Sequence, residues 1–259
     1  MAPPWAEHVQ GAAVADGCWY VTQVDRIWRF PLDLDLSGAD PDNPQVTNVG
    51  LPEPGIDHLG DGDIHDGRLY VAMEGTVPAR IGALDLDLRY LGSADVAAQA
   101  GSCPWCAIDP GDGLLYSSPF DTDRLCAYRP NWTEAGGFSL RHVRDVELRT
   151  EDGTPLRLER VQGGSFAEAG CLCLTSDSRD GGIHGIDVRT GRRMLHHRIP
   201  FEPDGPQNEV IEGIVATDLG APALPWLKGI LHVLVLARRQ DESDRVWFQH
   251  YDTRDHHPA

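Results

Sequence analysis

The sequence has few positive charges for its length. Its 259 residues include 22 Lys and Arg against 40 Asp and Glu, which gives a formal net charge of -18. Proteins that bind nucleic acids neutralise phosphates with Lys and Arg, and anionic membrane surfaces attract the same residues. We therefore expect neither nucleic acid nor membrane as a partner. A cation or a cationic small molecule is the ligand that this charge favours.

Long hydrophobic runs and targeting signals are also missing. The N-terminal residues Met1–Trp5 lack the basic start and the apolar core of a signal peptide. The most apolar stretch, Gly229–Ala237, is too short to cross a bilayer and contains His232. We therefore predict a cytoplasmic protein, in which the six cysteines are reduced. No phosphate-binding glycine loop, nucleophile elbow or zinc-finger spacing is present, so no nucleotide cofactor is expected.

A short phrase recurs five times along the chain. An apolar strand precedes each copy, and a turn such as Asp16-Gly17 or Asp66-Gly67 precedes that strand. The copies are Asp25–Trp28, Ala79–Gly82, Asp123–Cys126, Gly181–His184 and Asp244–Trp247. A repeated unit of short strands at this spacing is typical of a β-propeller. The sequence therefore predicts an all-β protein with five blades.

The two ends of the chain suggest how the ring closes. The fifth repeat has no outer strand before the chain stops, and the segment Trp5–Val9 precedes the first inner strand without a blade of its own. We predict that this segment is an N-terminal strand that completes the last blade, because closure removes exposed sheet edges. Six blades is the alternative, if residues 203–227 contain a degenerate unit. The predicted domain covers residues 1–252, followed by a tail at 253–259.

Several phrases resemble those of known bacterial propellers. They are Leu69–Ala72, Ala107–Pro110 followed by Gly113–Tyr116, and Ile183–Asp187. With them the chain resembles propellers of the SMP-30, NHL and LVIVD type. Lactonases of the SMP-30 group carry a Glu-Gly pair on an inner strand, and this Glu binds a divalent cation at the propeller axis. Glu212-Gly213 has that local form here, in the last blade, so the resemblance implies cation-assisted chemistry at the axis.

The innermost strands supply the candidate site. Gln10, Gln162 and Glu212 occupy the same place in their repeats, each directly before a glycine that lets strands approach closely. Residues equivalent under near-five-fold symmetry should converge on the axis. His58, Asp61 and Asp63 break the repeat pattern, and such departures are where function is grafted onto a fold. The candidates are His58, Asp61 and Glu212 for catalysis; Gln10, Trp105 and Gln162 for substrate binding; and Asp61, Asp63 and Glu212 for a metal.

These residue types indicate the chemistry. Carboxylate and amide oxygens suit Ca²⁺ or another divalent cation, and a histidine such as His58 titrates near working pH and can act as a general base. The predicted function is a metal-assisted hydrolase, lactonase-like, or an isomerase or cyclase, acting on a small molecule. The alternative is a propeller without catalysis that binds a ligand or protein through its acidic face. The sequence leaves the substrate, the metal and the oligomeric state open.

Two further patterns are interpreted as structural. Cys103 and Cys106 have the spacing of redox pairs, but they enter a strand, whereas redox chemistry depends on a helix N-terminus that lowers the thiol pKa. They are predicted to be buried, reduced thiols. Asp25, Asp123 and Asp244 recur beside Arg in the repeat, and recurrence indicates a role in folding.

Overall fold

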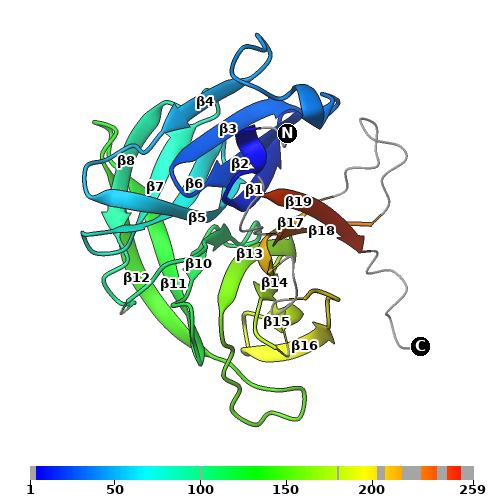
Figure 1. The fold of residues 1–259 in the computed structure, drawn as a ribbon. Helices are drawn as coiled ribbons and strands as arrows, with labels where there is room; N and C mark the ends of the chain where they lie inside the picture. The colour runs from blue at the N-terminus through cyan, green and yellow to red at the C-terminus, as the bar shows by residue number, and fades with distance from the viewer. Residues whose placement is uncertain are drawn as a thin grey trace.

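The protein is a five-bladed β-propeller. The computed structural model describes residues 4–99, 101–179, 181–202, 208–217, 229–237 and 244–251. Five antiparallel sheets lie around a common axis, with the first strand of each sheet innermost (Figure 1). The predicted all-β, five-bladed architecture is confirmed. Within the described ranges, no helix has both the length and the apolar character needed to span a bilayer.

The strands follow the chain outward in each blade. The first blade contains β1 (Val9–Ala15), β2 (Cys18–Gln23), β3 (Arg26–Pro31) and β4 (Thr47–Gly50). The second contains β5 (Ile56–His65), β6 (Arg68–Gly75), β7 (Arg80–Asp85) and β8 (Tyr90–Asp95). The third contains β9 (Ala107–Ile108), β10 (Leu115–Ser117), β11 (Arg124–Trp132) and β12 (Phe138–Glu147). The fourth contains β13 (Val161–Glu168), β14 (Cys171–Ser176), β15 (Gly182–Asp187) and β16 (Arg192–His197), and the fifth β17 (Glu209–Ala216), β18 (Leu231–Ala237) and β19 (Arg245–Tyr251).

The tight turns between inner and second strands use residues that tolerate left-handed backbone. Asp16 and Gly17 have φ angles of 49° and 72°, and Asp66 and Gly67 have 49° and 69°. Two consecutive positive φ angles are the requirement of a type I′ hairpin, for which Asp-Gly is a preferred sequence. The repeated Asp-Gly pairs therefore set the register of the two innermost strands.

Apolar side chains fill the spaces between neighbouring blades. Trp19 of the first blade and Phe248 of the last contact each other with ring centroids 5.1 Å apart. Tyr116 and Phe166 join the third and fourth blades in the same way, at 5.5 Å. Each inter-blade space thus forms its own hydrophobic core, and burial of these faces drives the sheets together around the axis.

The N-terminal segment does not form the predicted strand. Pro4–Ala6 is a short 3-10 helix (η1), and the last sheet contains three strands in the described residues. Proline lacks the N–H that a strand ladder needs but fits the first turn of a helix, and His8 has a φ of 51°, which interrupts an extended chain. Trp5 is buried in the core between the first and last blades, and the His8 N–H donates to the Asp244 carboxylate at 2.9 Å. The segment therefore helps to close the ring by side-chain packing and this hydrogen bond.

The proposed sixth unit and the C-terminal tail fall partly outside the described residues. Within 203–227, the described residues 208–217 contain β17, which is the inner strand of the fifth blade. The remainder of that region and the tail at 253–259 lie outside the described ranges. The described part of the chain thus accounts for five blades.

Candidate functional site

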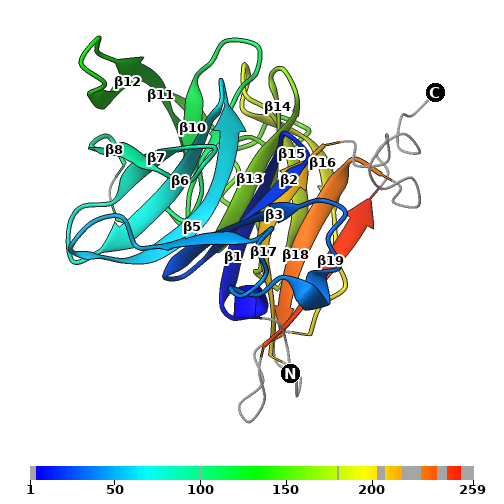
Figure 2. The same ribbon diagram turned by 90° about the horizontal axis from the view of Figure 1, so that it is seen from above.

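Glycines bring the inner strands into contact at the axis. A Cβ atom added to Gly213 of β17 would lie 2.6 Å from the Cα of Gly11 in β1, and one added to Gly163 of β13 would lie 2.6 Å from the Cα of Gly213. Three blades therefore meet backbone to backbone. Gln10, Gln162 and Glu212 each directly precede one of these glycines, so their backbones are neighbours at the axis. We call the end where the inner strands begin the front end and the end where they finish the back end (Figure 2).

At the front end, Gln10 orients His58. The Gln10 amide nitrogen donates to the carbonyl of Val9 at 3.0 Å, which fixes the direction of the amide. Its oxygen therefore faces the Nε2 of His58, 3.0 Å away across the boundary between the first two blades. Because an amide oxygen only accepts, His58 carries a proton on Nε2. In the neutral ring, Nδ1 is then the nitrogen that can take up a proton.

A second polar group at the front end comes from the fourth blade. Arg160 donates from Nε and from a terminal nitrogen to the two carboxylate oxygens of Asp177, each at 2.6 Å. Gln162 donates to the same carboxylate at 3.2 Å. The hydrogen bond with Asp177, together with the charges of Glu212 and Asp121, raises the pKa of Arg160. Glu212, only 1% exposed, thus lies within the electrostatic reach of a fixed cation.

Arg160 is a residue that the sequence analysis missed. It has a φ of 53°, a costly conformation for a residue other than glycine. The Arg160 N–H donates to Asp121 at 3.0 Å, and its carbonyl accepts from the N–H of Asp177 at 3.1 Å, so its backbone is held on both sides. Strained residues of this kind cluster at functional sites. A sequence signal exists: Arg160 is a basic residue of an acidic chain, two positions before Gln162, which directly precedes a glycine.

Asp61 occupies the axis itself. Its side chain is fully buried and accepts hydrogen bonds from the N–H groups of Gly62 at 3.0 Å, Gly164 at 3.1 Å and Ile214 at 3.3 Å. Burial raises the pKa of this carboxyl well above its ordinary value, and the three N–H donors limit the rise. Asp61 therefore joins blades two, four and five at their common centre, where the sequence analysis had placed a catalytic group and metal ligand.

Asp63 lies farther toward the back end on the same strand. It is half-buried and accepts hydrogen bonds from the N–H groups of Ile64 at 2.8 Å and Ile108 at 2.9 Å. Burial raises its pKa to about 6. Among the described residues, no group of three or more His, Cys, Asp and Glu side chains is arranged to hold a metal ion. The cation site on Asp61, Asp63 and Glu212 stays a prediction, and the carboxylates of Asp61 and Asp63 accept from different backbone N–H groups.

Trp105 does not face the front end. Its ring is fully buried in the core between the third and fourth blades, and its Nε1 donates to the Ser118 hydroxyl at 3.1 Å. A Cβ atom on Gly164 would overlap with this ring, so the glycine makes room for it. The structure thus gives Trp105, predicted to bind substrate, a packing role.

The thiols of Cys103 and Cys106 are buried and free, as predicted. Burial raises the pKa of Cys103 to about 12 and that of Cys106 well above its ordinary value. Cys171 differs, because it is partly exposed and the hydrogen bond with Cys173 lowers its pKa. Since the thiolate is the reactive species, we expect an alkylating reagent to label Cys171 of the native protein first, with Cys103 and Cys106 labelled only after unfolding. Peptide mapping by mass spectrometry checks this order, and rapid native labelling of Cys103 would contradict it.

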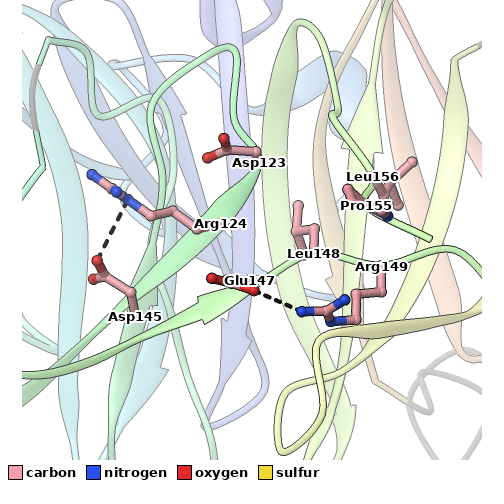
Figure 3. Close-up of a pocket in the computed structure, with 8 residues that line it drawn as sticks. All are labelled: Asp123, Arg124, Asp145, Glu147, Leu148, Arg149, Pro155 and Leu156. Atoms are coloured by element: carbon pink, nitrogen blue, oxygen red, sulfur yellow. Dashed lines mark hydrogen bonds and ion pairs between the residues drawn. The ribbon is translucent and has the colours of Figure 1, made fainter. Parts of the chain in front are cut away.

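A pocket of about 350 Å³ lies away from the axis, beside the ends of β11 and β12 (Figure 3). Arg124 pairs with Asp145 at 3.5 Å, and Arg149 with Glu147 at 2.7 Å. Asp123, one of the repeated aspartates, lines it, but no residue of the predicted site does. Because none of the predicted site residues lines this pocket, we do not place the function here.

Comparisons with known proteins identify the architecture. No family model matches the sequence, and no curated protein matches it either. Among solved structures, the chain is similar to the glutaminyl cyclase of Myxococcus xanthus, at 13% identity and a TM-score of 0.57, over 95% of this chain and 93% of that one. It is also similar to a luciferin-regenerating enzyme, at 14% identity and a TM-score of 0.51, over 94% and 79%. At these identities the similarity shows a shared β-propeller fold.

Proposed function

We propose that the protein is an enzyme that cyclises or hydrolyses a small carbonyl compound carrying a basic nitrogen, at the front end of the propeller axis. One observation supports this most directly. The inner strands touch at the glycines that follow Gln10, Gln162 and Glu212, so these three residues are neighbours at the axis. The Gln10 side chain also orients the ring of His58. A merely structural axis needs small or apolar residues at these positions, whereas neighbouring polar side chains are the usual composition of a small-molecule site.

The roles follow from the proton positions. Glu212 is the proposed base: it takes the proton from the attacking nitrogen or water as the new bond to the carbonyl carbon forms. His58, protonated on both nitrogens, donates from Nδ1 to the leaving group as the bond to it breaks, while Gln10 keeps hold of Nε2. The Arg160 guanidinium and the Gln162 amide stabilise the negative charge that develops on the carbonyl oxygen. These steps need side chains alone.

The acidic character of the chain supports a substrate with positive charge. With a formal net charge of -18, the protein attracts cations to its surface and repels anions. The fold similarity to the Myxococcus xanthus glutaminyl cyclase gives a first substrate to try, a peptide that begins with glutamine. Attack of its free amine on the side-chain amide forms a ring and releases ammonia. Lactones that carry an amino group form the second arm of the trial, after the resemblance to SMP-30-type propellers.

The test is turnover by the purified protein and its variants. We expect a product with the mass of the peptide less ammonia, or of the lactone plus water, detected by mass spectrometry. Glu212→Gln should lower kcat by about 10²- to 10⁴-fold, the usual contribution of a general base, and His58→Gln by a similar factor. Asp25→Asn, which removes an exposed carboxylate from a loop next to β3, is the matched control and should keep full activity.

Melting curves separate catalysis from folding, because Glu212 is buried and its replacement can also cost stability. A Glu212→Gln protein that melts like the wild type but has lost turnover supports the assignment. Equal turnover in wild type and both variants would refute the proposed residues. Absence of turnover on both substrate classes would favour the binding propeller without catalysis.

A further inference from the structure

We propose a second ligand site, at the back end of the axis, that binds a small organic ammonium ion through Asp63. A cavity of about 190 Å³ opens there and is lined by the inner strands of all five blades. It lies more than about 10 Å behind His58, because β5 advances about 3.3 Å per residue from His58 to Asp63. Between the two ends stands Asp61, packed against the axial glycines. The cavity is therefore separate from the front-end site, and the inference does not depend on the proposed enzyme activity.

The charge of the lining selects a cation. Asp63 is the sole carboxylate among the described residues that line the cavity, His65 is the other ionisable side chain there, and none of these residues is Lys or Arg. Each Asp63 oxygen accepts one backbone N–H, from Ile64 and Ile108, and keeps lone pairs for another donor. These two bonds also fix the carboxylate at the wall, so little conformational freedom is lost when a ligand pairs with it.

A second polar group lies across the axis from Asp63. The Ser165 hydroxyl of β13, 9% exposed, accepts from the N–H of Ala216 at 3.0 Å and lines the same cavity. An ammonium group has three N–H donors, which Asp63 and Ser165 can share. Apolar side chains, Phe166 and Val215 among them, also line the cavity and suit the hydrocarbon part of such a ligand.

The same geometry favours an organic cation over a metal ion. Ca²⁺ needs six to eight oxygen ligands, commonly with several carboxylates, whereas Asp63 stands alone and no metal-binding group of three or more His, Cys, Asp and Glu occurs among the described residues. The volume holds about six water molecules at ~30 Å³ each. A primary amine with about four carbon atoms matches that volume.

Butylammonium is the probe, with butan-1-ol as its neutral counterpart of the same size. We expect butylammonium to shift the NMR signals of the Asp63 carboxyl and the Val215 methyl groups in a saturable way, with butan-1-ol binding at least about tenfold more weakly, as a lost charge-assisted hydrogen bond implies. Asp63→Asn should weaken butylammonium binding by about tenfold or more. Asp87→Asn removes an exposed carboxylate that does not line the cavity and should change binding by less than about twofold.

If Asp63→Asn fails to fold, the site is tested by NMR on the wild-type protein. Nuclear Overhauser contacts between butylammonium and the methyl groups of Val215 and Ala13 must then appear, since both residues line the cavity. No saturable binding, equal binding of butan-1-ol, or full binding by a folded Asp63→Asn variant would overturn the proposal. Displacement of butylammonium by an equal concentration of Ca²⁺ would also overturn it, in favour of a metal site.

Discussion

Replacement of Gly213 by alanine is expected to prevent the ring from closing. The new Cβ atom would stand 2.6 Å from the Cα of Gly11 and 2.8 Å from the Oδ1 of Asp61. The first neighbour is backbone of another blade, and the second belongs to a carboxylate held by hydrogen bonds from Gly62, Gly164 and Ile214. Overpacking usually costs about 1–3 kcal/mol when side chains can move aside. Here they cannot, so we expect a loss of more than about 3 kcal/mol, measured by urea unfolding.

Substitutions at two other glycines distinguish steric overlap from backbone strain as the cause of such a loss of stability. Gly50 has open space around it and no positive φ, so Gly50→Ala should change stability by less than about 0.5 kcal/mol. Gly67 has open space but a φ of 69°, so Gly67→Ala should cost about 1 kcal/mol through backbone strain alone. If Gly213→Ala unfolded with a midpoint close to that of Gly50→Ala, the close approach of blades at the axis would be wrong.

The sequence predicted the ring because its signals are local and repeated. Asp-Gly turns and apolar second strands depend on neighbouring residues, and five copies reinforce one another. The failure at Trp5–Val9 has the opposite cause. Its placement depends on contacts far along the chain, such as the hydrogen bond from the Trp5 ring to the carbonyl of Leu36 and that from His8 to Asp244. An orphan segment and an incomplete blade do not reveal those contacts.

The candidate site was predicted in part for a similar reason. Position before a glycine in the repeat identified Gln10, Gln162 and Glu212, since the symmetry of the fold converts equal sequence positions into proximity. The same symmetry does not predict the side-chain direction of a residue that breaks the repeat pattern. Asp61 and Asp63 were grouped with Glu212, yet β5 directs their carboxylates to backbone N–H groups of other blades. Arg160 was missed because its strained backbone is a property of the folded chain.

Replacement of Asp61 by alanine should be the most damaging change of a polar residue. The carboxylate accepts from three buried N–H groups, contributed by blades two, four and five. Alanine would leave all three without an acceptor, and each buried, unsatisfied donor costs about 1–3 kcal/mol. It would also leave a void among the glycines that now pack on the side chain. We expect a loss of about 4 kcal/mol or more, or no folded protein at all.

Asp61→Asn tests the same hydrogen bonds with a side chain of nearly the same shape. The amide keeps the shape and one acceptor oxygen, which can serve Gly164 and Ile214 as Oδ2 does now. Its NH₂ group would meet the N–H of Gly62, so we expect a loss intermediate between wild type and Asp61→Ala. Equal stability of Asp61→Ala and wild type would show that the axis is held by packing alone.

The pH dependence of stability separates charge from shape at this position. Burial raises the pKa of Asp61 above 3.8 in the folded protein, so the native state binds a proton more tightly than the unfolded chain does. The stabilisation by that proton is complete below pH 3.8 and is lost as pH rises through the folded pKa. Asparagine has no proton to lose, so the stability of Asp61→Asn relative to wild type should improve as pH rises. Urea unfolding of both proteins at several pH values measures this difference, and a constant difference would mean that Asp61 is ionised in the folded state as it is in the unfolded chain.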